Sequence, residues 1–170
     1  MKVITLIVLS ISILISQPVA ADQWPLVVTA EPEWSIEYTD DGVHFFTLTR
    51  PEGENVLLMF SKWPASGGKE QIPGLIKRMA DGFLDKEKNK VMSFIFKNEY
   101  EVEKLEGDEF SGEAAIFKGR FELFQTMFMV SDGDGIWNGQ FSGSETMWVE
   151  AKIILENLRR PAKSLPTLSD

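Results

Sequence analysis

The sequence predicts an α+β fold, in which an antiparallel β-sheet carries one helix packed on each face, in the order βββ-α-ββββ-α. Residues 121–130 are apolar on both sides at strand spacing: one side holds Phe124, Thr126, Phe128 and Val130, and the other holds Phe121, Leu123, Gln125, Met127 and Met129. A strand of this kind needs cover on both sides. Residues 72–84 and 148–158 carry apolar stripes at helical spacing and can supply that cover. We therefore expect residues 121–130 to be the central strand of a sheet of about six to eight strands.

The first 21 residues have the pattern of a secretory signal peptide. Lys2 precedes the uncharged apolar run of residues 3–15, Pro18 ends that run, and Ala20 and Ala21 supply the small residues that signal peptidase requires. The run is shorter than the ~20 apolar residues of a transmembrane helix, so we expect cleavage after Ala20 or Ala21. The protein is then exported and soluble, periplasmic or secreted, with no transmembrane segment in the mature chain. A retained N-terminal anchor is the alternative.

The mature chain is expected to form one α+β domain over residues 22–160, followed by a disordered polar tail over residues 161–170. It contains no cysteine, so the domain depends on its core alone. The full chain has a net charge of −9, and loss of a leader whose only charge is Lys2 makes it −10. This acidity argues against nucleic acid or an anionic lipid surface as a partner, and it suits a basic protein partner or plain solubility.

The N-terminal part of the domain reads as a three-stranded meander. Asp41-Gly42 separates two β-prone runs and is a hairpin signal. A second turn over residues 51–54 contains Pro51 and Gly53. The three expected strands are residues 34–38, 43–49 and 55–61.

The period then changes to that of a helix over residues 72–84. Pro73 suits its first turn, where the missing N–H of proline costs nothing, and we expect the helix to end near Asp85. A charged connector over residues 85–90 follows. Residues 91–96 resume β character, and the half-polar pattern of residues 100–105 is typical of a strand near the sheet edge.

The C-terminal part reads as further strands followed by the second helix. Residues 112–118 lead into the central strand, and a hairpin turn over residues 131–135 leads to a strand over residues 136–141. Ser142 and Glu145 have the spacing of a capping box at the start of the helix, and Pro161 ends it.

This order of elements resembles that of the PsbP-like fold family, whose members end in a hairpin followed by an amphipathic helix, as residues 135–160 do here. The matching parts are residues 43–60, 72–84 and 127–158. The resemblance implies a small exported or lumenal accessory protein that binds other proteins without catalysis of its own. The family has no catalytic residues to carry over to this sequence.

No residue pattern indicates a catalytic, metal or cofactor site, and we expect none. His44 is the only histidine, so a hydrolase would need it in a cleft beside a serine or an aspartate, but it shares a strand face with Phe46 and Leu48. The segment Asp132-Gly133-Asp134-Gly135 begins like a calcium loop. Because the fifth ligand position is an isoleucine and the twelfth a glycine, a hairpin turn fits it better.

Two of the five tryptophans are candidates for partner binding. Trp24 and Trp63 stand in proline-containing loops, where a large ring is hard to bury, and exposed loop tryptophans are frequent interface anchors. The alternative is that each ring folds back over an open end of the sheet. Trp34, Trp137 and Trp148 fit the apolar pattern and are expected in the core.

The sequence is thus most consistent with a non-catalytic protein-binding or accessory module, either an envelope accessory factor or a protein of the inhibitor or immunity type. Two alternatives stay open. One is a small hydrolase that uses His44, and the other is a carrier of an apolar ligand, suggested by the methionines and phenylalanines of residues 121–130.

Overall fold

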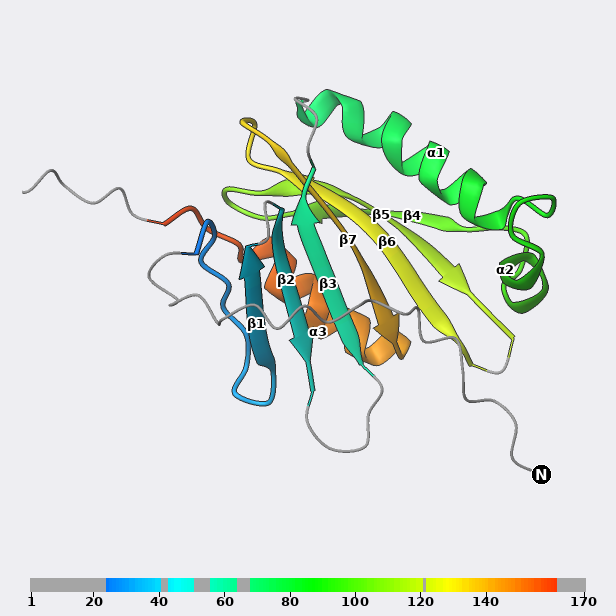
Figure 1. Ribbon diagram of the computed structural model, residues 1–170, viewed down its shortest axis with the longest axis horizontal. Coiled ribbons are helices and arrows are strands. Elements are labelled where there is room, and N and C mark those ends of the chain that lie inside the picture. Colours follow the sequence, from blue (N-terminus) through cyan, green and yellow to red (C-terminus); the bar gives the residue numbers. More distant parts are fainter. Residues whose placement is uncertain (1–23, 41–42, 51–55, 64–67, 121, 162–170) are drawn as a thin grey trace, which may run out of the picture.

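A computed structural model of the chain describes residues 24–40, 43–50, 56–63, 68–120 and 122–161. Within these residues, seven strands form one antiparallel sheet that is flanked by helices (Figure 1). The strands are β1 (Ser35–Asp40), β2 (His44–Thr49), β3 (Leu57–Lys62), β4 (Glu101–Glu106), β5 (Ser111–Lys118), β6 (Phe124–Ser131) and β7 (Ile136–Gly143). The helices are α1 (Ile72–Leu84), α2 (Lys90–Ile95) and α3 (Glu145–Glu156), with a 3-10 turn, η2 (Lys69–Gln71), before α1. The α+β class and the antiparallel sheet are confirmed.

Several sequence predictions concern residues outside this described part. They are the signal peptide over residues 1–21, the turn at Asp41-Gly42, the turn over residues 51–54, and all but the first residue of the polar tail. Pro64, which brackets Trp63, and Phe121 also lie outside it.

The strand order is β1-β2-β3-β7-β6-β5-β4, so the C-terminal hairpin β6–β7 lies between the N-terminal meander and β5. The predicted central strand is β6, but the middle position belongs to β7, which pairs with β3 on one side and β6 on the other. The apolar pattern did not indicate β7 as the middle strand, because β7 contains the polar or small residues Asn138, Gly139 and Gln140. The half-polar segment β4 lies at the edge, as predicted.

Buried side chains form two clusters that the sheet separates. Neighbouring strand residues point to opposite faces, and Ala114 and Ala115 belong to different clusters. The first cluster holds the buried side chains of α3, among them Trp148 and Leu155, and the second holds those of α1, among them Ile76. The three tryptophans expected in the core, Trp34, Trp137 and Trp148, are buried.

The prediction of β character for residues 91–96 is wrong for the first five of them, which belong to the helix α2. A short apolar run cannot be assigned to helix or strand from periodicity alone. As a helix, the segment brings Met92, Ile95 and Phe96 to the second cluster at spacings of three and four residues. Only Phe96 retains a β-bridge, to Gly119.

The predicted start of the last helix is also shifted. Ser144, not Ser142, is the N-cap of α3, and its Oγ accepts a hydrogen bond from the Met147 amide at 3.2 Å. Ser142 remains in β7, because that strand pairs with β3 through Leu57 and with β6 through Gln125. By contrast, α1 ends at Leu84 and has Pro73 in its first turn, as predicted.

Candidate functional site

An apolar groove opens where α2, the turn between β5 and β6, and the start of α3 meet. Its volume is about 650 Å³, which lies in the range of small-molecule and peptide side-chain pockets. The apolar lining consists of Val56, Met92, Ile95, Phe96, Leu123, Phe124 and Met147. We take this groove as the candidate site.

The wall of the groove depends on a close contact between α2 and the β5–β6 turn. The Arg120 amide donates to the Ile95 carbonyl at 2.8 Å, and the Gly119 amide donates to the Leu123 carbonyl at 2.7 Å. A Cβ on Gly119 would lie 2.9 Å from the Leu123 Cβ and 3.1 Å from Phe96 Cδ1. A glycine is therefore needed here for the turn to pack against the helix.

The rim of the groove carries large apolar side chains that nothing in the described part of the chain covers. We use the word rim for the exposed apolar side chains of the two segments that border the groove, which are Val91 and Phe94 of α2 and Leu123 of the turn, with exposed fractions of 54%, 65% and 46%. Of these three, Leu123 lines the groove itself. The Arg120 guanidinium lies over the Phe94 ring, 5.3 Å from its centroid. A cation over the face of an aromatic ring is a favourable contact, and arginine and aromatic residues are frequent among interface hot spots.

The two serine hydroxyls that line the groove make hydrogen bonds within the chain. The Ser142 hydroxyl donates to Gln125 Oε1 at 3.1 Å, and the Ser144 hydroxyl serves the α3 cap. These pairs supply no nucleophile or general base, because such a group needs a proton acceptor within reach. The groove is therefore suited to binding by burial of apolar surface.

His44 lies elsewhere, at the hairpin between β1 and β2, and does not line the groove. Its Nδ1 is 2.5 Å from the Tyr38 hydroxyl and 3.5 Å from Asp40 Oδ2. Burial raises the pKa of the Tyr38 hydroxyl, and the neighbouring Asp40 carboxylate raises it further. Asp40 is thus the aspartate beside His44 that the hydrolase hypothesis allows, while among the described residues no serine hydroxyl is hydrogen-bonded to His44, and the hypothesis stays open.

The two loop tryptophans are partly buried, and each packs against one of the two clusters. Trp24 packs against the first cluster, with its ring 5.9 Å from Tyr38 and 5.6 Å from Phe46 between centroids. Trp63 packs against the second cluster, and its amide donates to the Ile136 carbonyl at 2.7 Å. Both rings thus fold back onto the sheet, and their role in partner binding stays a prediction.

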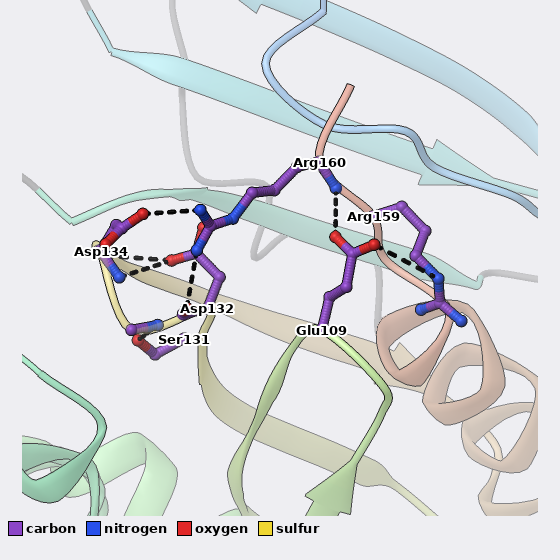
Figure 2. A network of polar contacts seen from close by, with 8 residues as sticks. Glu109, Ser131, Asp132, Asp134, Arg159 and Arg160 are labelled. Carbon is purple, nitrogen blue, oxygen red and sulfur yellow. Dashed lines mark hydrogen bonds and ion pairs between the residues drawn. The ribbon is translucent and has the colours of Figure 1, made fainter. Parts of the chain in front are cut away.

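The acidic turn that resembles the start of a calcium loop is a hairpin turn held by arginine (Figure 2). Asp132 Oδ1 accepts hydrogen bonds from the Asp134 and Gly135 amides. The Arg160 guanidinium contacts Asp132 Oδ2 at 2.8 Å and Asp134 Oδ2 at 2.7 Å. Among the described residues, no group of three or more acidic, histidine or cysteine side chains is arranged to hold a metal ion.

The groove residues were missed in the sequence because α2 was interpreted as a strand. The signal that could have found them is the number of apolar residues in the six residues 90–95, which include Val91, Met92, Phe94 and Ile95. One face of a short helix cannot bury all four, so some of them must stay exposed.

No protein-family model matches the chain, and a search of curated proteins finds no significant match. In the described residues, the longest helix has 13 residues, and none is long and apolar enough to cross a bilayer.

Proposed function

We propose that the chain is an exported, soluble, non-catalytic protein-binding or accessory module, and that the groove and its rim form its binding surface. The fold proposed with this function is the PsbP-like arrangement, with one helix on each face of the sheet. The observation that carries the proposal is the open apolar groove together with the exposed apolar side chains of the segments that border it, Leu123 in its lining and Phe94 of α2, which is 65% exposed. Apolar surface of this kind is costly to leave in water and usually marks an interaction site.

Two features favour a macromolecular partner over a reaction at this site. Among the described residues that line the groove, the serine hydroxyls are engaged within the chain, Ser142 with Gln125 and Ser144 with the Met147 amide, and neither has a base beside it. The rim extends beyond the groove, whereas a small ligand would be mostly enclosed by its pocket. An envelope accessory factor and an inhibitor or immunity protein both fit this description.

The test compares partner capture by three variants. We expect Phe94→Ser to weaken partner binding by about 2 kcal/mol, or roughly 30-fold, as loss of an interface anchor does. Ile153→Ser is the matched control, because Ile153 on α3 is also exposed, at 53%, but lies away from the groove. Trp63→Ala tests the loop-tryptophan prediction. The measurement is quantitative recovery of proteins from the native envelope fraction, with melting temperatures recorded for every variant.

His44→Gln separates binding from hydrolysis. A binding module keeps its function in this variant, whereas a hydrolase that uses the only histidine of the chain loses it. Loss of function in a folded His44→Gln protein would overturn the proposal.

A carrier of an apolar ligand is the second candidate, because the groove has a ligand-sized volume of about 650 Å³ and methionines in its walls. Mass spectrometry of organic extracts from the native purified protein distinguishes the two. A stoichiometric lipid or other apolar compound supports the carrier.

A further inference from the structure

We propose that part of the sheet face on the side of α1 is a second interface, and that its partner is a second copy of this chain. We call this surface the neutral face. It is defined by half-buried residues that β2, β3 and β7 turn to this side, which are Phe45, Thr47, Met59, Ser61, Asn138 and Gln140. The inference goes beyond the proposed function, because none of these six residues lines the groove.

The neutral face is open because α1 does not extend over it. The helix packs mainly over β5 and β6, whose side chains on this side, such as Ala115 and Met129, are fully buried (Figure 1). The opposite sides of β2 and β3 are also fully buried, and Phe46 and Leu58 there belong to the first cluster. These strands thus have one buried side and one side that no helix of the described part of the chain covers.

The composition of the neutral face differs from that of an ordinary solvated sheet face. None of the residues that β2, β3 and β7 turn to this side is charged, although 25% of the residues of the chain are. A lack of charge combined with aromatic residues and methionine is the composition of an interface core. Phe45 and Met59 are of this kind, and together with Met79 of α1 and Met127 of β6 they line a cavity of about 220 Å³. The face therefore has the composition of a surface that a partner covers.

The absence of charge indicates which partner. Each chain has a net charge of −9, so two copies can associate only where neither brings charges into the contact. The neutral face meets this condition, and charge returns only at its border, where Glu37 of the edge strand β1 lies next to Thr47. The polar groups of the face are hydroxyls and amides, which both donate and accept hydrogen bonds. Such a surface is complementary to itself, as the contact between two copies across a two-fold axis requires.

The size of the open face also fits a second copy. At the usual spacing of ~4.8 Å between strands and ~3.3 Å between residues, β1, β2, β3 and β7 present an area of roughly 20 Å by 20 Å on this side. Two such faces bury on the order of 1,000 Å² together, which is the lower limit for a specific interface. A second sheet stacked on the neutral face would continue the layer that α1 begins over β5 and β6.

The experiment measures the mass of the purified protein in solution by sedimentation equilibrium. We expect a dimer, and we expect Gln140→Lys to weaken association at least about tenfold, because Gln140 lies in the middle of the sheet and its two copies meet near the two-fold axis. Val149→Lys is the matched control, because it adds the same charge to α3 at a position that is 57% exposed and outside the neutral face. The control should associate like the wild type, and melting temperatures show that both variants are folded.

A pair of opposite charges then tests the two-fold arrangement. Gln140→Lys and Gln140→Glu should each associate weakly alone, because like charges meet across the axis. An equimolar mixture of the two should form heterodimers, because the added ammonium group of one copy faces the added carboxylate of the other.

The outcomes separate this inference from the proposed function. A wild-type protein that stays monomeric at about 100 μM, where an interface of this size should associate, overturns the inference. So does a mixture of the two charged variants that associates no better than either alone, or an equal loss of association in Val149→Lys. A different protein that binds the monomer and is lost with Gln140→Lys would overturn the choice of a second copy. None of these results concerns the groove, so the proposed function stands or falls with the Phe94→Ser test instead.

Discussion

Gly139 is a single residue on which the centre of the sheet depends. It lies in β7, opposite Phe60 of β3 and Phe128 of β6. A Cβ at this position would meet the Met59 carbonyl oxygen at 2.1 Å and Phe128 Cζ at 2.5 Å. Two large rings can pack across the middle strand because the residue between them has no side chain.

We therefore expect Gly139→Ala to lower the free energy of unfolding by about 3 kcal/mol, because the added methyl group overpacks the core and displaces backbone. Gly82→Ala is the control, since an added Cβ there has nothing within 4 Å. That change removes a glycine from the interior of α1 and should raise the free energy of unfolding by about 0.5–1 kcal/mol. Urea denaturation of both variants measures the difference, and equal stabilities would contradict the packing account.

At the scale of elements, a charged contact fixes α3 to the edge strand β4. The Glu103 carboxylate accepts from the Trp148 indole at 2.9 Å and from the Lys152 ammonium at 2.6 Å. Burial by itself would raise the pKa of Glu103, but the hydrogen bonds from Lys152 and Trp148 together lower it below its usual value. The hydrogen bond to Glu103 raises the pKa of Lys152.

These pKa shifts predict how the contact depends on pH. A lowered carboxyl pKa stabilises the folded state above the usual pKa of glutamate, and this stabilisation is lost as the pH falls through the folded pKa. We expect Glu103→Gln to cost about 1 kcal/mol at pH 7, a value reduced by the partial exposure of the pair.

The cost of Glu103→Gln should shrink as the pH falls below the usual pKa of glutamate and through the lowered pKa of the folded state, where the wild-type carboxyl becomes neutral. Unfolding curves at several pH values check this, with Glu37→Gln as the control, because Glu37 is an exposed glutamate on the other edge strand, β1. A cost that does not change with pH would show that packing, not charge, accounts for the contact.

At the scale of the whole molecule, the two ends of the sheet differ in how their charges are used. At one end, Arg160 pairs with Asp132 and Arg159 pairs with Glu109, on two hairpins, so opposite charges are balanced within the chain (Figure 2). At the other end, Arg120 lies beside the groove with its guanidinium in no ion pair among the described residues. The binding surface that we propose lies at the groove end.

The predicted export also concerns the whole molecule, because removal of the signal peptide decides which form of the protein meets a partner. We expect the mature protein to begin at Ala21 or Asp22, since the small residues that signal peptidase requires follow the apolar run. Intact-mass measurement of the protein recovered from the periplasm or medium checks this. A mass that includes Met1 would overturn the predicted localisation.

Much of the fold could be predicted from local pattern. The strand ranges of the meander, the span of α1 and the edge position of β4 follow from alternation, helical stripes and turn residues, because those signals report which side chains must leave water. The hairpin at Asp132 was predicted for the same reason, since turn residues act through their own backbone.

Tertiary contacts decided the rest. The assignment of residues 90–95 to a helix, the capping of α3 by Ser144 and the middle position of β7 each depend on pairing or burial against segments distant in sequence, which a local pattern does not contain. The sequence by itself determined an α+β chain with an antiparallel sheet. Only the tertiary structure brought α2 to the β5–β6 turn and so created the groove, because a binding surface is made of residues that become neighbours on folding.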